Sequence, residues 1–140
     1  MLKVNQNYIN SIVKQALKED LRPNGDITTN LISSKNKIAK IITKQNGVIA
    51  GLDFCRAAFK LVGKESVFIG KVKDGSKVKK NKVIAEIKAK TKTILIAERT
   101  ALNFLNHASG IATLTNQYVN KVNKKTKICC TRKTTPNLRL

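Results

Sequence analysis

The sequence TILIAERTALNFLNHASGIAT, residues 93–113, lies within the longest helical pattern of the chain, which extends from about residue 93 to 122. At about 100° per residue, its apolar side chains share one broad face. We expect that face to pack into a core, and its members are Ile94, Ala97, Ala101, Phe104, Leu105 and Ala108. Ser109 and Gly110 interrupt the pattern and predict a break or kink in the helix.

The opposite face of this helix carries Arg99, Asn103, Asn106 and His107. It has no lysine, although the chain holds 28 lysines and arginines. The guanidinium of an arginine pairs with carboxylates and phosphates in a bidentate manner. Two interpretations stay open: this face contacts a ligand or another subunit, or it is simply solvated. His107 is more typical of an interface than of a catalyst.

The segments before this helix alternate between helical and strand patterns, separated by glycine-containing turns. We expect helices at 8–20 and 52–62, and strands at 37–44, 48–51, 66–73 and 82–89. A turn at 74–76 joins the last two strands, and Gly63 ends the second helix. Asp26 is positioned to cap a short turn over 27–31. This order predicts an α+β domain that is joined to the opening of another unit.

The last apolar run, residues 127–131, predicts a buried strand. Thr131, Arg132 and Lys133 follow at its carboxyl end, where open sheets and α/β barrels place ligand sites. These side chains form either an anion-binding corner or an ordinary charged loop. Because Cys129 and Cys130 would point to opposite faces of a strand, they are not expected to share a metal.

Composition excludes several classes of protein. With 140 residues and 41% hydrophobic content, the chain suits one domain, or a small domain plus part of another. It has no apolar run of the ~20 residues that a membrane span needs, so we expect a cytoplasmic protein. Three cysteines without CxxC spacing argue against a disulfide scaffold or a zinc module. Phosphate-binding P-loop and GxGxxG patterns are also missing.

The formal net charge of +20 raises the possibility of a nucleic-acid binder. Only 4% of the residues are aromatic, however, so platforms for stacking bases are scarce. A positive field also gathers small phosphorylated or carboxylated ligands. We therefore favour small anionic ligands over nucleic acid.

Several short motifs occur in an order that resembles the quinolinate phosphoribosyltransferase family. Each motif is weak alone, but together they cover the whole chain. They are DL (20–21), GDITT (25–29), GVIAG (47–51), DG (74–75), AERTALNFL (97–105), SGIAT (109–113) and TRKTTP (131–136).

The resemblance implies a reaction of NAD biosynthesis. Quinolinate and phosphoribosyl pyrophosphate, with Mg²⁺, would give nicotinate mononucleotide, pyrophosphate and carbon dioxide. It also implies an N-terminal α/β sandwich domain, here residues 1–112 with most of the long helix, followed by the first strand of a truncated α/β barrel in residues 113–140. Members of the family form homodimers or larger oligomers, with each site built between two subunits.

The resemblance also assigns roles to residues. Arg99 corresponds to the arginine that one subunit lends to the quinolinate carboxylates of its neighbour. Thr131, Arg132 and Lys133 correspond to the first substrate loop, with Arg132 on a quinolinate carboxylate and Lys133 near phosphoribosyl pyrophosphate. Asp26, Thr28 and Thr29 are expected to be structural. Cys130 stands where the family usually has aspartate, which removes an acidic group beside the loop.

A complete barrel of this kind needs on the order of 250 residues, and this chain supplies one strand of it. We therefore expect the 140 residues alone to be inactive. Three alternatives remain at this point. They are a barrel-sandwich carrier, a basic nucleic-acid-binding module, and a related protein associated with molybdenum transport. The carrier would need a modifiable lysine in a hairpin setting, which the sequence lacks.

Overall fold

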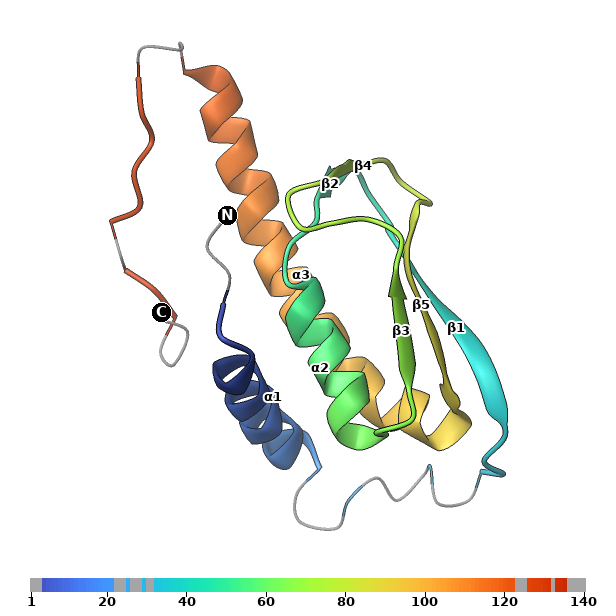
Figure 1. Ribbon diagram of the computed structural model, residues 1–140. Helices are drawn as coiled ribbons and strands as arrows, with labels where there is room; N and C mark the ends of the chain where they lie inside the picture. The colour runs from blue at the N-terminus through green and yellow to red at the C-terminus, as the bar shows by residue number, and fades with distance from the viewer. Residues whose placement is uncertain are drawn as a thin grey trace.

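The computed structural model describes residues 4–21, 25, 29, 32–122, 126–131 and 133–135 (Figure 1). It is an α+β fold, as the sequence predicts. In chain order, its elements are α1 (Gln6–Asp20), β1 (Asn36–Ile42), β2 (Gly47–Val48), α2 (Leu52–Val62), β3 (Val67–Gly70), β4 (Lys77–Val78), β5 (Val83–Lys90) and α3 (Thr91–Lys121). Each predicted helix is present. Each predicted strand up to residue 89 has a counterpart, but the strand predicted at 48–51 is reduced to Gly47–Val48 and that predicted at 66–73 to Val67–Gly70. The two-residue strand β4 was not predicted as a separate element.

The main sheet has the strand order β1-β5-β3, and both pairs are antiparallel. Its central strand alternates between the two faces of the sheet. Ile87 lies between Ala39 and Phe68 and is fully buried, whereas the next residue, Lys88, is exposed on the outer face. A second, two-stranded sheet pairs β2 with β4. The inner face of the main sheet therefore supplies one wall of the core.

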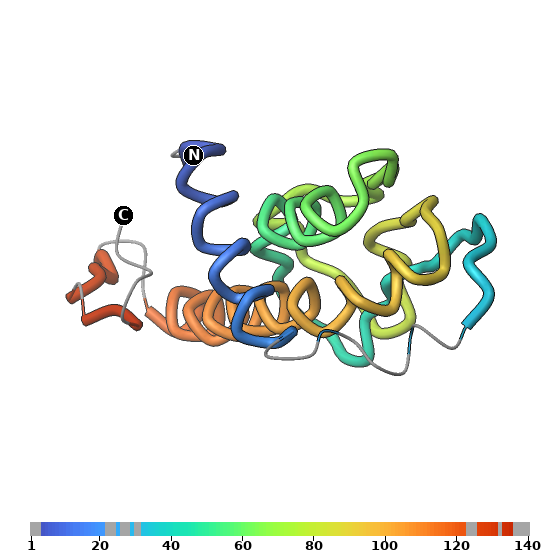
Figure 2. The backbone as a smooth tube through the Cα atoms, turned by 90° about the horizontal axis from the view of Figure 1, so that it is seen from below, coloured from blue at the N-terminus to red at the C-terminus, as the bar shows by residue number. Residues whose placement is uncertain are grey.

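Helices α2 and α3 lie between the main sheet and α1 (Figures 1 and 2). Their contacts use small side chains, so the two helices approach closely. Ala58, Ala97 and Ala101 are fully buried, as is Cys55. Helix α1 adds Ile9, Val13 and Leu17 to the same core. The apolar face predicted for the first half of α3 is thus the face that packs.

Asp74 caps helix α2 from a distant loop. The helix starts after Gly51, whose φ of +93° is a conformation that suits glycine. The backbone N–H groups of Gly51 and Leu52 donate to the two carboxylate oxygens of Asp74, at 3.0 and 3.1 Å. The sequence predicted only a turn at this aspartate. The capping role depends on tertiary contact between residues more than 20 positions apart.

Helix α3 continues without interruption through Ser109 and Gly110, so the predicted break is wrong. The hydroxyl of Ser109 instead bonds to the backbone of Ala50, accepting from its N–H and donating to its carbonyl at 3.1 Å. One turn later, the hydroxyl of Thr113 accepts from the N–H of Val48 at 2.9 Å. The polar residues that resembled a helix breaker are thus attachments between α3 and the β2 segment.

Residues 126–131 do not form the predicted buried strand. They carry no strand hydrogen bonding and are exposed, including Ile128, Cys129 and Cys130. A strand is stable only when a neighbouring strand satisfies its backbone groups. No such neighbour lies beside this segment in the part of the chain that the structure describes. The inference that the two cysteines face opposite sides of a strand fails with it.

The short turn that Asp26 was expected to cap lies largely outside the described residues, as do Asp26 and Thr28 themselves. Thr29 is described and is buried, with 2% of its surface exposed. Among the helices that the structure describes, none combines the length and the apolar character needed to cross a membrane.

Candidate functional site

A cleft of about 500 Å³ lies between α1 and the polar face of α3. Ala16, Glu19 and Asp20 line it from α1. Thr135 lines it from the C-terminal segment, which runs back towards α1 (Figure 1). The α3 side consists of Thr100, Asn103, Phe104, Asn106 and His107. The polar face that the sequence singled out is therefore the wall of a real depression.

Arg99 projects from α3 beside this cleft, with 76% of its side chain exposed. Its Nη1 donates to Oδ1 of Asp20, the last residue of α1, at 3.3 Å. An exposed ion pair of this length contributes little stability, roughly 0–1 kcal/mol. The guanidinium is thus held near the cleft but stays accessible to a ligand carboxylate that replaces Asp20.

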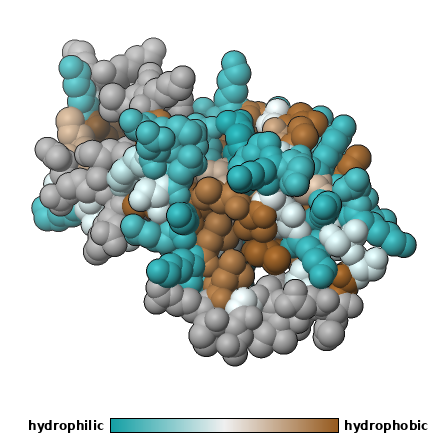
Figure 3. Space-filling view, turned by 60° about the horizontal axis from the view of Figure 1, so that its bottom comes forward, coloured by the Kyte–Doolittle hydropathy of each residue, from teal (hydrophilic) through white to brown (hydrophobic). Residues whose placement is uncertain are grey.

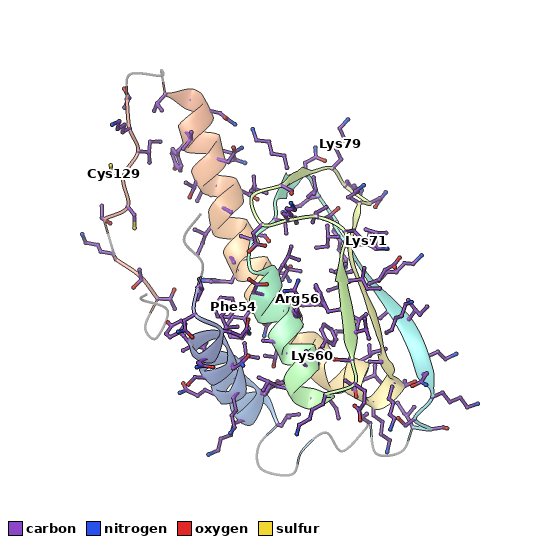
Figure 4. The ribbon with its side chains drawn as sticks, in the orientation of Figure 1. Phe54, Arg56, Lys60, Lys71, Lys79 and Cys129 are labelled. Carbon is purple, nitrogen blue, oxygen red and sulfur yellow. The ribbon has the colours of Figure 1, made fainter. Side chains whose placement is uncertain are left out.

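The cleft combines an aromatic residue with polar residues. Phe104 lies at the cleft and stacks on Phe54, with ring centroids 5.2 Å apart. Phe54 belongs to α2 and is labelled in Figure 4. The exposed side chains of Asn103, Asn106 and His107 are hydrogen-bonding groups at the same cleft. With the Arg99 cation beside them, these groups suit a small anionic ligand that also offers an apolar surface.

The residues of the predicted substrate loop are only partly placed. Thr131 and Lys133 are exposed, and Arg132 lies outside the described residues. Thr135, which follows them, reaches the cleft. The structure thus brings the end of this loop to the α3 polar face, but it records no contact between Arg99 and Thr131 or Lys133.

The sequence did not identify the contribution of α1 to this site. Glu19 and Asp20, at the charged end of α1, both line the cleft, and Asp20 pairs with Arg99. Helical periodicity reports which face of α1 is apolar, but not which residue of a second helix lies opposite. The one available signal was that Asp20-Leu21 belongs to the motif series.

The described residues include no group of three or more His, Cys, Asp or Glu side chains that could hold a metal ion. Glu19 and Asp20 are the only carboxylates that line the described cleft.

Comparison with known proteins places the chain in one family. The family model for the N-terminal domain of quinolinate phosphoribosyl transferase matches residues 26–109, and the model for the C-terminal domain of the same enzyme matches residues 111–140. A probable nicotinate-nucleotide pyrophosphorylase from Methanocaldococcus jannaschii is 41% identical over 138 residues, which are 95% of this chain and 47% of that protein. A quinolinate phosphoribosyltransferase from Nicotiana tabacum is 34% identical over 94% of this chain and 38% of its own length.

Solved structures agree with the sequence matches. The nicotinate-nucleotide pyrophosphorylase of Francisella tularensis superposes with a TM-score of 0.91 at 36% identity, over 96% of this chain and 48% of that chain. NadC from Streptococcus pyogenes gives a TM-score of 0.93 at 35% identity, over 99% of this chain and 50% of that one. The chain thus spans about half the length of its relatives, or less. On its sequence and its fold, it belongs to the quinolinate phosphoribosyltransferase family.

Proposed function

We propose that this chain supplies the N-terminal domain and the first substrate loop of a cytoplasmic quinolinate phosphoribosyltransferase. The enzyme would convert quinolinate and phosphoribosyl pyrophosphate to nicotinate mononucleotide, pyrophosphate and carbon dioxide. The observation that carries the proposal is the pair of family-model matches, which together extend from residue 26 to 140. The domain division at residues 112 and 113 is part of this proposal.

Arg99 is proposed to bind a quinolinate carboxylate in a neighbouring subunit of a homodimer or larger oligomer. Its exposure supports this role, because a guanidinium that is to contact another subunit must be accessible on the isolated chain. Its weak ion pair with Asp20 supports it as well. A carboxylate of the substrate would exchange with that of Asp20, and the charge-assisted bonds would fix the orientation of the ring.

The loop residues Thr131, Arg132 and Lys133 are proposed to complete the anion site. Arg132 would hold a second carboxylate, and Lys133 would lie near the phosphoribosyl pyrophosphate. Positive charge at these positions stabilises both the bound polyanions and the departing pyrophosphate. Magnesium would arrive with the pyrophosphate group of the substrate, and no step here is assigned to a metal ligand of this chain. Cys130 adds no negative charge beside the loop.

A chimaera tests the proposal directly. Residues 1–140 of this chain replace the matching half of the Methanocaldococcus jannaschii relative, and quinolinate-dependent pyrophosphate release is measured. We expect the chimaera to be active and the 140-residue chain alone to be inactive. Turnover by the isolated chain above a blank would contradict the assignment of the remaining site to the half of the relatives that this chain does not match. A folded chimaera without activity would contradict the proposed function.

The role of Arg99 is tested in the same chimaera. We expect Arg99→Ala to lower kcat/KM about 100-fold or more, since a charge-assisted contact to substrate is lost. Arg56→Ala is the matched control, because Arg56 is also exposed and also pairs with an aspartate, at 2.7 Å. It should change kcat/KM less than about threefold. Equal losses in the two variants would show that the effect is structural.

A further inference from the structure

The ion pair between Asp20 and Arg99 places a carboxylate of the chain itself on the guanidinium that we assign to the substrate. The two side chains differ in exposure, at 76% for Arg99 and 23% for Asp20. Arg99 Nη1 donates to Asp20 Oδ1 at 3.3 Å. The carboxylate is therefore the more enclosed partner, and a ligand from solution can approach the guanidinium without first moving α1.

Helix α1 fixes the position of this carboxylate. Its apolar residues in the core, Val13 and Leu17 among them, are at most 7% exposed. The N–H of Leu21 donates to the carbonyl of Leu17 at 3.0 Å, so the last turn of the helix, which ends at Asp20, is closed. Asp20 thus stays beside α3, whereas the long and exposed side chain of Arg99 is free to change its rotamer.

The end of α1 is an unfavourable place for negative charge. The last carbonyl groups of a helix carry a partial negative charge, which favours cations and repels carboxylates. Lys18 in the last turn follows this rule, whereas Glu19 and Asp20 oppose it. The chain has only eight acidic residues against 28 basic ones, and these two both line the same cleft. Charges that break a local rule without stabilising the fold are expected at functional sites.

The two carboxylates also determine the charge that an anionic ligand meets at the cleft. With histidine counted as neutral, the other polar residues that line it carry no formal charge, and they are Thr100, Asn103, Asn106, His107 and Thr135. Two carboxylates and the one guanidinium beside them give a local charge of −1, in a protein of net charge +20. Carboxylates at this position oppose the binding of a second carboxylate.

We propose that Asp20 competes with the substrate for Arg99: it holds the guanidinium in the empty site and lowers the affinity for a substrate carboxylate. This inference rests on the proposed function, and it adds a regulation of the same site. The substrate must break the existing pair before it binds, whereas the chemical step follows that exchange. Weaker binding of the ground state does not by itself slow turnover. When the product leaves, the pair with Asp20 forms again and returns Arg99 to its starting position. Asp20 is thus a positioning residue, which acts through Arg99.

The test is Asp20→Asn in the chimaera described above, because the amide keeps the shape of the side chain and removes its charge. We expect the KM for quinolinate to fall about threefold to tenfold, with kcat changed by less than about twofold. The KM for phosphoribosyl pyrophosphate should change by less than about twofold, because that substrate is not assigned to Arg99. An unchanged or raised KM for quinolinate would overturn the proposal. Equal falls in both KM values would also overturn it, because they would report a general attraction of anions.

Two further variants isolate the competition. Glu98→Gln removes the same charge from the exposed neighbour of Arg99 in sequence, which is not among the described residues that line the cleft. It should leave the KM for quinolinate within about twofold of the parent value. In an Arg99→Ala background, Asp20→Asn should have no further effect, because the competitor acts only through Arg99. An equal fall in Glu98→Gln, or the same fall without Arg99, would contradict the proposal.

A binding measurement on the 140-residue chain does not depend on turnover. The side-chain signal of Arg99 in the ¹⁵N-labelled chain is followed while quinolinate is added at constant ionic strength. We expect half-saturation of the shift in Asp20→Asn at a concentration at least about threefold lower than in the parent chain. Equal concentrations would overturn the competition even if the chimaera were active. A folded but inactive chimaera would contradict the proposed function, and this titration would still decide whether Asp20 competes for Arg99.

Discussion

The two halves of α3 belong to different environments, although they form one continuous helix. In the first half, Ala97, Ala101 and Leu105 are at most 3% exposed, and they pack against α2 and the sheet. In the second half, the large apolar side chains have no such cover: Ile111, Leu114, Tyr118 and Val119 are between 49% and 57% exposed. The apolar side chains in the first half of α3 are thus buried in a core, whereas those in its second half form an exposed apolar stripe.

This difference separates the part of the fold that is packed by the chain's own residues from the part whose apolar side chains stay exposed. The sandwich encloses its core, with Phe59, Ile84 and Ile87 at most 2% exposed. The stripe on α3 begins where the match to the C-terminal domain model begins, at residue 111. Figure 3 shows a further apolar patch on the lower face, with hydrophilic residues beside and above it. The N-terminal unit should therefore fold by itself, whereas the segment after residue 111 should depend on contacts that the described residues do not provide.

Thiol reactivity gives the largest contrast between the two regions. Burial raises the pKa of the Cys55 thiol to about 12, while the nearby Arg56 lowers it slightly. At neutral pH this leaves roughly a thousandth of the thiolate that a thiol at its ordinary pKa would have. Cys129 and Cys130 are exposed. We expect two thiols per chain to react quickly with a disulfide reagent, and the third at least about a thousandfold more slowly.

The control for this measurement is the same reaction in denaturant, where all three thiols should react at similar rates. Cys55→Ala should remove only the slow phase. If just one thiol reacts quickly in the native chain, the segment 126–131 is covered in solution, and the predicted difference in exposure between this segment and the core is wrong. Rapid reaction of all three thiols would show that the core around Cys55 opens readily.

Paired leucine truncations on α3 measure the same contrast as a free energy. Leu105 is 3% exposed and Leu114 is 54% exposed, so the chemical change is identical while burial differs. We expect Leu105→Ala to lower the free energy of unfolding by about 2–5 kcal/mol, and Leu114→Ala by no more than about 0.5 kcal/mol. Urea unfolding followed by circular dichroism measures both. A loss above about 1 kcal/mol in Leu114→Ala would mean that self-association covers the stripe, and it should then vanish on dilution.

The sequence alone was sufficient to predict which residues are buried where helical periodicity determines burial. Ala97, Ala101 and Leu105 were assigned to the core, and Arg99 and His107 to the polar face, because a helix repeats every 3.6 residues whatever its neighbours are. Prediction from the sequence failed where a residue far along the chain determines the role of a side chain. Ser109 and Asp74 resemble a breaker and a turn residue locally, but their roles come from Ala50 and Gly51. The buried strand at 127–131 failed for a related reason, since strands require neighbours that a local pattern does not reveal.

The candidate site follows the same rule. Arg99 was identified from its helix face and from the motif series, whereas its pairing with Asp20 joins residues 79 positions apart. No local signal reports which side chain of α1 lies opposite α3.

Removing the cap of α2 tests a tertiary contact that lies wholly within the packed part of the fold, before residue 111. Asp74→Ala leaves the N–H groups of Gly51 and Leu52 without their carboxylate acceptor, and we expect a loss of about 1–2 kcal/mol in the free energy of unfolding. Asp74→Asn should keep most of that stability, because an amide oxygen also accepts from a helix start. If the alanine and asparagine variants were equally destabilised, the negative charge rather than the cap would be responsible.

The smallest expected effect is a pH-dependent one on the outer face of the main sheet. Lys71 Nζ lies 2.9 Å from Oε2 of Glu86. That hydrogen bond is the main cause that holds the pKa of Glu86 below its ordinary value of 4.5, with the charges of Lys71, Lys40 and Lys88 adding to it against partial desolvation. Since the pKa is lowered in the folded state, the stabilisation is fully present above the unfolded pKa. It is lost as the pH falls through the lower, folded value.

Glu86→Gln should therefore lower the Tm slightly at neutral pH, and the gap from the parent chain should close as the pH falls below about 4.5. The pair is partly exposed, so the gap should be smaller than that caused by Asp74→Ala and should shrink in high salt. Lys71→Gln should reproduce the same acid dependence, and the double variant should add little to either single change. A gap that persists to pH 2 would assign the effect of Glu86 to packing of its side chain rather than to its charge.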